Sequence, residues 1–469
     1  MKLIFKPFST PRGKYVYDRE TNNIHQVSDD EYDAFCRLKK GIETKSDLAI
    51  LNSFQQKGYF PKPILELVMH PQDHLLDFHV NNKVEKVTMQ VTQNCNLRCL
   101  YCTYSGTYEQ RGHSNKVMSY EVMKRSVDYG MNHSANSKQI DFGFYGGEPL
   151  LEFENIKKIV HYIRKNYPYK KVTLSLTTNG TVFTDNIIEF LFAEGFNILV
   201  SLDGPKEMHD KNRVFADGQG SYDKLMKNIM YIKDKYPDFF NKISFNTVIA
   251  PGGDYKCLSE YFNASDVIGD SVLSTSLVSD FNSLKSIQYD DLYYVNYGVQ
   301  RTKMLLAALG IISKKEVSKF FSLELPILAR TYNDFGCLQN LSPAAHPSGT
   351  CIPGARRPFV DTDGNIFPCE RVSESSESMR IGSVFTGIDI EKARALLNIG
   401  KITEDECKNC WNFIHCTLCC NSADDINELS KNRRLSYCES AKTGTLNSFI
   451  TICLLRENGY LFEEETYNV

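Results

Sequence analysis

Three cysteines, Cys95, Cys99 and Cys102, lie in one short run of the sequence. Three thiolates on a tight loop can hold three irons of a cubane cluster and leave the fourth iron open to a small molecule, whereas structural four-cysteine sites leave no open position. A zinc loop is the alternative interpretation of the same residues. The C-x3-C-x2-C spacing therefore indicates an open metal-cluster site.

Polar residues suited to a small ligand follow the cysteine loop. In Gly146-Gly147-Glu148-Pro149, two glycines let the chain approach a ligand closely, and the carboxylate can accept hydrogen bonds from an ammonium group. Arg213 suits a carboxylate because its planar guanidinium can bond through two nitrogens; a surface arginine is the alternative. The remaining candidates are Asn179, Ser201, Asp203 and Asn246.

A second group of cysteines occupies the last third of the chain. Cys351, Gly364 and Cys369 give C-x12-G-x4-C, and a later run gives C-x2-C-x5-C-x3-C. The later cysteines are Cys407, Cys410, Cys416, Cys420 and Cys438. A zinc ribbon would explain the C-x2-C pair but not the Cys351–Cys369 spacing, so the group indicates further metal clusters.

The residues between the two cysteine groups alternate between strand and helix patterns. Strands are predicted at Val84–Val91, Gln139–Phe144, Lys171–Leu176, Asn197–Leu202, Lys242–Val248 and Ser271–Ser276. Helices are predicted at Glu121–Asn132, Phe153–Lys165, Asp185–Glu194, Tyr222–Lys235 and Leu258–Phe262. This α/β alternation predicts a parallel sheet, either a partial barrel or a doubly wound sheet. Because the polar motifs follow the predicted strands, they should gather on one rim, as in a barrel.

The N-terminal stretch has a separate pattern. Short strands are predicted at Leu3–Phe8, Tyr15–Asp18 and Ile24–Val27, followed by helices at about 30–39 and 45–56, the first capped by Ser28 or Asp29. We therefore expect domains at 1–80, 84–280 and 341–469, with a helical bridge at 281–340.

Composition and charge limit the partners and the cellular compartment that we expect for this protein. The 469 residues carry a formal net charge of −3, so no basic field indicates nucleic-acid binding. The sequence has no long apolar run and no recognisable signal peptide, so we expect a cytoplasmic protein that does not bind a membrane. Fifteen cysteines without an export signal are better explained by metal binding than by disulfides.

The cysteine loop, with Tyr101 before its last cysteine, and the Gly-Gly-Glu-Pro turn resemble the motifs of radical S-adenosylmethionine (SAM) enzymes. The resemblance implies a partial (β/α)6 TIM-like barrel and a [4Fe-4S] cluster that cleaves SAM to a 5′-deoxyadenosyl radical. In that family the residues matching Gly146, Gly147, Glu148 and Pro149 hold the methionine amino group. Tyr101 and the backbone near Val248 would contact adenine, and Ser201 and Arg213 would contact the ribose or the carboxylate. Asn179, Asp203 and Asn246 are further SAM-binding candidates.

The second cysteine group resembles the SPASM extension of radical SAM enzymes, which holds two auxiliary [4Fe-4S] clusters and brings the total to three. The resemblance implies that Cys407, Cys410, Cys416 and Cys438 bind a distal cluster. Cys351, Cys369 and Cys420 would bind a proximal cluster, with Cys337 as a fourth ligand or with one iron open to a substrate thiolate. Cys419 has the wrong spacing and is given no role.

The N-terminal module resembles the winged-helix-like element by which peptide-maturing enzymes bind the leader of a precursor peptide; a structural cap is the alternative. The segments around Cys351 and Cys369 resemble those of sactipeptide and ranthipeptide maturases, which implies that thioether crosslinks form in a cysteine-containing peptide. Flavodoxin or ferredoxin would donate electrons. Alternatives are formylglycine formation, with Glu370 as base beside Cys369, and carbon–carbon crosslinking or epimerisation. A cluster-bearing scaffold without activity is disfavoured because it has no use for an open iron.

Overall fold

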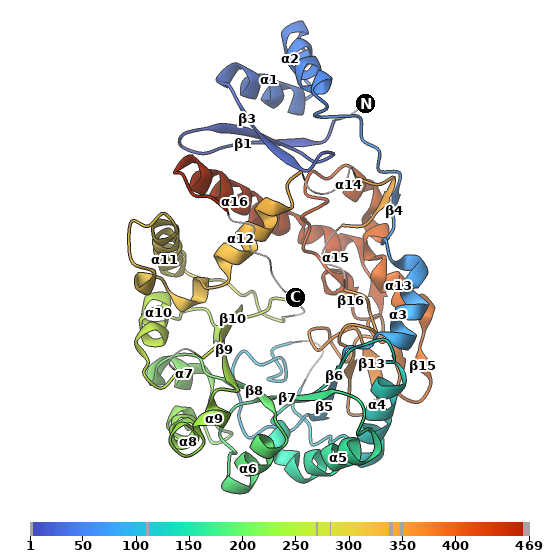
Figure 1. Ribbon diagram of the computed structural model, residues 1–469, viewed down its shortest axis with the longest axis vertical. Helices are drawn as coiled ribbons and strands as arrows, with labels where there is room; N and C mark the ends of the chain where they lie inside the picture. The colour runs from blue at the N-terminus through green and yellow to red at the C-terminus, as the bar shows by residue number, and fades with distance from the viewer. Residues whose placement is uncertain are drawn as a thin grey trace.

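The computed structural model describes residues 3–108, 112–268, 271–281, 283–336, 341–347 and 351–462. Six parallel strands pair in chain order, and helices connect them (Figure 1). The strands are β5 (Lys86–Thr92), β6 (Ile140–Gly146), β7 (Val172–Thr178), β8 (Asn197–Ser201), β9 (Ile243–Ile249) and β10 (Leu273–Leu277). The helices between them are α4 (Tyr120–Asn132), α5 (Phe153–Asn166), α6 (Asp185–Ala193), α8 (Tyr222–Lys235) and α10 (Tyr255–Ala264). The predicted α/β fold is confirmed.

Three helical details differ from the sequence predictions. Helix α10 begins at Tyr255 rather than Leu258, because Asp254 accepts hydrogen bonds from the backbone N–H groups of Lys256 and Cys257 and caps the helix earlier. The short helices α7 (Lys206–Asn212) and α9 (Pro237–Phe240) were not predicted. Each is too short to show a helical repeat of apolar residues.

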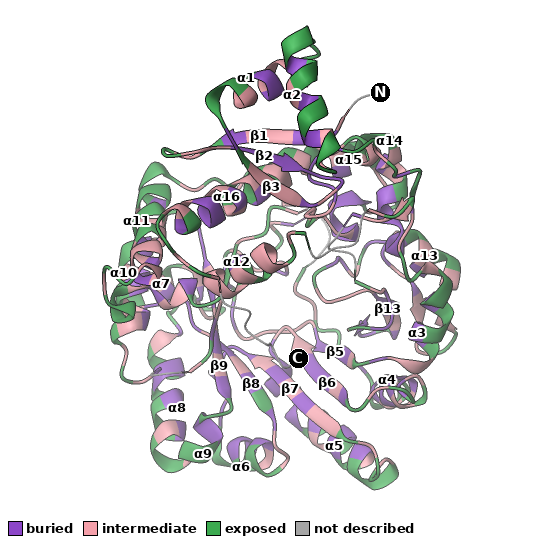
Figure 2. Cartoon of the chain, turned by 45° about the horizontal axis from the view of Figure 1, so that its top comes forward, coloured by how far each residue is buried: buried purple, intermediate pink, exposed green. Residues whose placement is uncertain are grey.

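The parallel strands have one apolar face and one polar face. In β7, Leu174 and Leu176 are buried under the outer helices, whereas Thr173 and Ser175 are half-buried on the concave face. The same alternation runs along β9, and Figure 2 shows alternating purple and pink on the parallel strands. A closed barrel fills its interior with side chains, whereas this concave face stays partly accessible.

The C-terminal region continues the barrel sheet. Strand β12 (Phe359–Val360) pairs in parallel with β5, and β13 (Asn365–Phe367), β14 (Gly382–Ser383) and β15 (Gly387–Ile388) follow antiparallel, which gives a ten-stranded sheet within the described residues. The backbone N–H of Thr88 donates to the carbonyl of Pro358 at 2.9 Å. The edge of β5, which carries the cysteine loop, is therefore covered.

The N-terminal unit is a three-stranded antiparallel sheet between two helical layers. Strands β1 (Phe5–Ser9), β2 (Lys14–Asp18) and β3 (Asn23–Val27) precede α1 (Asp29–Lys39) and α2 (Lys45–Gln56), and Ser28 and Thr44 cap these helices through capping boxes. One sheet face packs on α1 and α2 around Phe35. The other packs on Trp411 and on Phe449 of α16 (Cys438–Glu457), so the unit lies on the C-terminal region.

The segment after the N-terminal unit also packs on the C-terminal region. Strand β4 (Leu67–Val68) pairs with β11 (Ala344–Ala345), and the 3-10 helix η1 (Asp73–Leu75) leads into α3 (Leu76–Asn82). Leu76 and Val80 of α3 join a core with Ala393 and Leu397 of α13 (Ile390–Leu397). The domain limits at 80, 84, 280 and 341 stay predictions.

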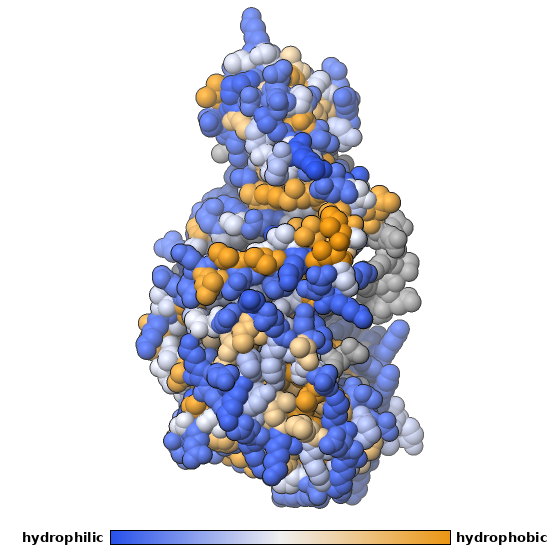
Figure 3. Space-filling model, turned by 90° about the vertical axis from the view of Figure 1, so that its left-hand side faces the viewer, coloured by the Kyte–Doolittle hydropathy of each residue, from blue (hydrophilic) through white to orange (hydrophobic). Residues whose placement is uncertain are grey.

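Helices α11 (Asp291–Ala308) and α12 (Glu324–Asn333) lie within residues 281–340, where a helical bridge was predicted. Large apolar side chains are exposed here, including Leu292 and Val295 on α11 and Ile327 on α12, and Figure 3 shows apolar residues gathered on the side of the molecule that carries α11. The remaining elements are the 3-10 helices η2 (Pro149–Glu152), η3 (Lys314–Glu316), η4 (Lys319–Phe321), η5 (Ile399–Thr403) and η6 (Cys420–Ala423), helices α14 (Glu404–Lys408) and α15 (Lys431–Ser436), and strands β16 (Asp424–Asp425) and β17 (Glu428–Leu429). Within the described ranges, no helix has the length and apolarity that a membrane span requires.

Candidate functional site

The cysteine loop lies directly after β5, and each of its three sulfurs receives an N–H group. The backbone of Leu97 donates to Sγ of Cys95 at 3.3 Å, and the backbone of Tyr104 donates to Sγ of Cys102 at 3.4 Å. Nη1 of Arg213 lies 3.9 Å from Sγ of Cys99. Burial raises the pKa of Cys95 to about 12 and that of Cys99 to about 11. Thiols that face N–H donors fit cluster ligation, because a metal stabilises the thiolate form.

The Gly146-Gly147 turn holds this loop by backbone contact. A Cβ on Gly146 would lie 2.2 Å from the carbonyl oxygen of Thr92, and one on Gly147 would lie 2.0 Å from that of Asn94. The N–H groups of Gly147 and Glu148 donate to these two carbonyls at 2.8 and 2.9 Å. The glycines therefore permit close approach to the cysteine loop itself, in addition to any approach to SAM.

Glu148 is fully buried, and its carboxylate joins the ends of β6 and β7. The carboxylate accepts hydrogen bonds from the backbone N–H of Asn179 at 2.8 Å, the hydroxyl of Thr178 at 2.8 Å and the backbone N–H of Leu150 at 3.1 Å. Burial raises the pKa of Glu148 to about 7, against these hydrogen bonds. Its predicted contact with the methionine amino group stays a prediction. The following Pro149 is buried and begins η2.

Asp203 collects three donors at the end of β8. The hydroxyl of Tyr101 donates to its carboxylate, Nε of Arg213 bonds it at 2.8 Å, and the backbone N–H of Val248 donates at 3.0 Å. The guanidinium of Arg213 also lies over the ring of Tyr101, 5.4 Å from its centre. Four of the predicted SAM-binding residues thus meet in one buried network beside Cys99, and their individual roles stay predictions.

His209 and Ser221, which were not predicted from the sequence, support this network. The backbone N–H of Asp203 donates to Nδ1 of His209 at 3.2 Å, and Nε2 of His209 lies 3.0 Å from Oγ of Ser221. The hydroxyl of Ser221 donates to the carbonyl of Arg213 at 2.8 Å. Burial lowers the pKa of His209 to about 4, so the ring is neutral at pH 7. A lone histidine after a strand gives no sequence signal for this role.

The other predicted rim residues also lie at strand ends. Nδ2 of Asn179 lies 3.8 Å from Sγ of Cys95 and donates to Oδ1 of Asn96 at 2.9 Å, which ties β7 to the loop. Ser201 pairs with Asn246 across β8 and β9, and Oδ1 of Asn246 accepts from Ser274 at 2.9 Å. The structure therefore gathers the predicted residues on one rim.

A charged cluster on the concave face was also missed. Nζ of Lys86 on β5 lies 2.9 Å from Oδ2 of Asp141 on β6 and 3.1 Å from Oγ of Ser175 on β7. Thr173 and Ser175 donate to the Asp141 carboxylate at 2.9 and 2.7 Å. Strand register could have revealed the cluster, because Lys86 lies opposite Asp141 and Asp141 lies opposite Thr173.

Four cysteines of the C-terminal region form one half-buried group. Burial raises the pKa values of Cys407, Cys410, Cys416 and Cys438, and their thiols act on one another electrostatically. In the described part of the chain, no three His, Cys, Asp or Glu side chains lie close enough to hold a single metal ion. Thiols that act on one another in this way fit cluster ligation, because a metal stabilises the thiolate form.

Only some of the cysteines predicted to bind the proximal cluster lie close together. Cys369 and Cys420 lie within electrostatic range of each other and of Cys419, and a hydrogen bond between Cys419 and Cys420 lowers the pKa of Cys419. Cys351 is exposed. Cys337 lies outside the described residues, so its predicted role is untested. Glu370, beside Cys369, pairs with Arg357 at 3.3 Å.

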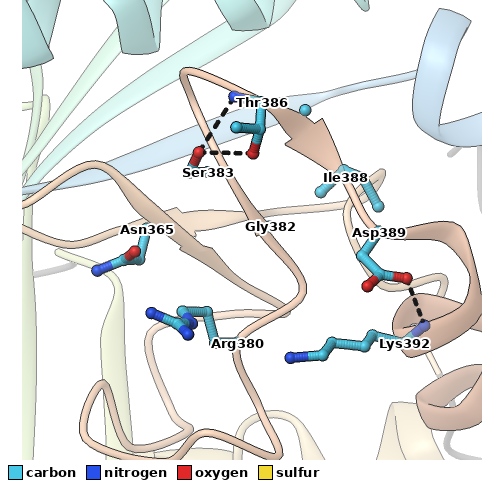
Figure 4. Close-up of a pocket in the computed structure, with 9 residues that line it drawn as sticks. Asn365, Arg380, Gly382, Ser383, Thr386, Ile388, Asp389 and Lys392 are labelled. Atoms are coloured by element: carbon cyan, nitrogen blue, oxygen red, sulfur yellow. Dashed lines mark hydrogen bonds between the residues drawn. The ribbon is translucent and has the colours of Figure 1, made fainter.

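A surface pocket on the β14–β15 hairpin lies apart from these groups (Figure 4). Arg380 and Lys392 line it and both pair with Glu377, at 2.7 and 3.1 Å. The carboxylate of Asp389 accepts from the backbone of Lys392 at 3.1 Å and caps α13. The charges of this pocket are therefore already matched within the protein.

Comparison with known proteins identifies the central domain. Residues 89–263 match the model of the Radical SAM superfamily, so the chain contains a radical SAM domain, with SAM and a 4Fe–4S cluster as its cofactors. A cysteine-type anaerobic sulfatase-maturating enzyme of Clostridium perfringens is 26% identical over 378 residues, which cover 75% of this chain and 92% of that enzyme. A serine-type counterpart from Bacteroides thetaiotaomicron is 33% identical over 143 residues, 30% of this chain and 34% of that enzyme.

A solved structure of native anSMEcpe with bound AdoMet has the same fold. Its TM-score is 0.58 at 23% identity, and the match covers 80% of this chain and 99% of that one. The same protein with AdoMet and the Cp18Cys peptide gives a TM-score of 0.55, at 23% identity and the same coverage. About a fifth of this chain therefore lies beyond the matched fold.

Proposed function

We propose that this chain is a radical SAM maturase that oxidises a cysteine or serine side chain of a peptide or protein substrate, by the formylglycine-forming chemistry of sulfatase maturation. The similarity to the Clostridium perfringens enzyme over most of both chains supports this ahead of thioether formation. When bound, the cofactors supply a hydrogen-abstracting radical at the Cys95–Cys102 loop and an electron acceptor at the C-terminal cysteines.

The observation that carries the proposal is the position of Glu370. Strand β13 ends at Phe367, which pairs with Phe359 of β12, and Phe359 pairs with Thr88 of β5. Cys369 and Glu370 therefore follow a strand of the sheet whose β5 carries the cysteine loop. Arg357 holds Glu370 as an ion pair at 3.3 Å. Glu370 accepts the proton of the substrate thiol or hydroxyl while the neighbouring carbon loses a hydrogen atom and an electron; serine then gives the aldehyde directly, whereas cysteine gives a thioaldehyde that water hydrolyses with release of hydrogen sulfide.

The concave face between these two sites binds the substrate. Lys86, Asp141 and Ser175 present a donor-and-acceptor cluster there, and Lys86 and Asp141 are 36% and 20% exposed. A peptide backbone offers the complementary carbonyl and N–H groups. The cluster orients the substrate without entering the chemistry.

Thioether crosslinking of a ribosomal peptide is the second candidate, because of the N-terminal unit. Strand β3 pairs only with β2 among the described strands, so it offers an edge to which a leader peptide can add as a further strand. A leader-guided substrate is typical of peptide maturation.

The reconstituted enzyme should be incubated with SAM, a reductant and either a short sulfatase-type cysteine peptide or a cysteine-rich peptide encoded beside the gene. A new carbonyl, trapped by a hydrazide reagent and located by mass spectrometry, supports formylglycine formation. E370Q should lose this product while still cleaving SAM, and E370D should retain part of it. Loss of two hydrogens per crosslink, with the matching thiols blocked to alkylation, would establish the second candidate instead.

A further inference from the structure

Arg434 of α15 is a buried cation to which the described residues offer no carboxylate partner. Its side chain is 1% exposed. The other two buried arginines of the described chain, Arg19 and Arg213, each pair with a carboxylate, Glu20 and Asp203. No described acidic side chain forms such a pair with Arg434. Burial of an uncompensated charge costs several kcal/mol as an order of magnitude, so its counter-charge must come from elsewhere.

The hydrogen bonds of Arg434 satisfy its N–H groups but do not neutralise it. Nη1 donates to the carbonyl of Cys419 and to Oγ of Ser422, both at 3.1 Å, and to the carbonyl of Leu418 at 3.4 Å. Nε donates to Oγ1 of Thr403 at 3.3 Å. All of these acceptors are uncharged. The guanidinium thus stays a fixed positive charge in a medium of low polarity, where its field is strong.

Thiols surround this charge. The guanidinium lies within electrostatic range of Cys407, Cys416, Cys419 and Cys438. Arg434 also lies near both cysteine groups. Its helix α15 falls between Cys420 and Cys438 in the sequence, and its side chain donates to the carbonyl of Cys419, the neighbour of Cys420. A cluster with four thiolates has a net charge of −2 when oxidised and −3 after gaining one electron, so it supplies the missing counter-charge.

The hydroxyl of Thr403 lies between the guanidinium of Arg434 and the sulfur of Cys407. Oγ1 of Thr403 lies 3.3 Å from Sγ of Cys407 and accepts from Nε of Arg434. When Cys407 is a thiolate it can only accept, so the Thr403 hydroxyl donates to it. This charge-assisted bond outweighs the alternative bond to the neutral carbonyl of Gly400, at 3.3 Å.

We propose that Arg434, through its charge and through Thr403, stabilises the reduced state of the auxiliary cluster at Cys407, Cys410, Cys416 and Cys438 and so raises its reduction potential. Arg434 is a positioning and tuning residue, since it acts on Cys407 through Thr403 and does not contact the substrate. The inference rests on the cluster assignment within the proposed function, but not on which peptide is the substrate. Hydrogen bonds to sulfur and local charge are established determinants of cluster potential.

The test is a redox titration of the full-length holoenzyme followed by electron paramagnetic resonance, with iron content measured in parallel. Signals that SAM addition leaves unchanged report the auxiliary clusters. R434Q should keep its iron and shift the auxiliary midpoint to a more negative potential, and T403V should shift it in the same direction by less. R433Q is the matched control, because Arg433 is on the same helix but pairs with Asp425 at 3.2 Å; its midpoint should not move.

Full iron with an unshifted midpoint in R434Q would overturn the proposal. If R434Q loses iron, two further variants test the proposal. An unshifted midpoint potential in T403V with full iron content overturns it. Recovery of the iron content and of the wild-type midpoint potential in R434K supports it. The cluster assignment is tested separately with C410A, which should lose one auxiliary signal. Retention of every signal in C410A would reject the assignment itself.

Discussion

The buried carboxyl of Glu148 makes the stability of the rim depend on pH. The pKa of Glu148 is about 7 in the folded protein, compared with 4.5 for the exposed group, because burial disfavours the charged form. The folded state therefore holds the proton more tightly than the open state. The contribution of this group to stability is greatest below pH 4.5 and is lost as the pH rises through about 7.

The size of the effect follows from the difference between the two pKa values. The full pKa difference corresponds to about 3 kcal/mol of stability, and about 2 kcal/mol of this is lost between about pH 5.5 and about pH 8. E148Q removes the titrating proton, so the difference in opening free energy between wild type and variant should change by about 2 kcal/mol over this interval. E148Q should also be less stable at the acidic end, because its amide cannot accept from both Thr178 and Asn179 as the carboxyl does.

Hydrogen exchange followed by mass spectrometry is the suitable assay, because it reports local opening and does not require reversible unfolding of the whole chain. Peptides that span β7 and the Thr178–Asn179 rim should be followed in wild type and E148Q without SAM, after correction for intrinsic exchange rates. T173V, which changes a contact near the other end of β7, is the control for strand weakening. An equal pH dependence in wild type and E148Q would refute the reasoning.

Four further expectations follow from the structure. C99A should abolish SAM cleavage while auxiliary iron remains, because an open-iron site needs all three loop thiolates; retained 5′-deoxyadenosine formation would contradict the assignment. K86M should raise the KM for the peptide and increase 5′-deoxyadenosine formed per product, since Lys86 faces Asp141 at 2.9 Å on the concave face; unchanged coupling would exclude a substrate role. F449A should lower stability by about 3–5 kcal/mol and make the N-terminal unit easier to cleave by limited proteolysis, because Phe449 is fully buried against Tyr17; unchanged melting would contradict the packing. Deletion of the first 80 or so residues should leave uncoupled SAM cleavage but lose peptide processing, and full processing would show that the module is only a cap.

Local patterns determined much of the fold. Alternating strands and helices gave the parallel sheet with limits close to those observed, because each element has its own period of apolar residues. The helix predicted at about 45–56 is observed at Lys45–Gln56, where Thr44 and Asp47 form a capping box at its start. Cysteine spacing predicted the open-cluster loop, because its candidate ligands lie close together in the chain.

Only the tertiary structure decided how distant segments meet. The ten-stranded sheet depends on pairing between Phe359 and Thr88, and a two-residue strand has no pattern of its own. The glycines of the Gly-Gly-Glu-Pro turn were expected to face SAM, and they also prove necessary for contact with the cysteine loop. The pairing of Arg213 with Asp203, and the lack of such a pair at Arg434 among the described residues, likewise follow from folding. Sequence fixes which groups can be charged, whereas burial and neighbours determine what balances each charge.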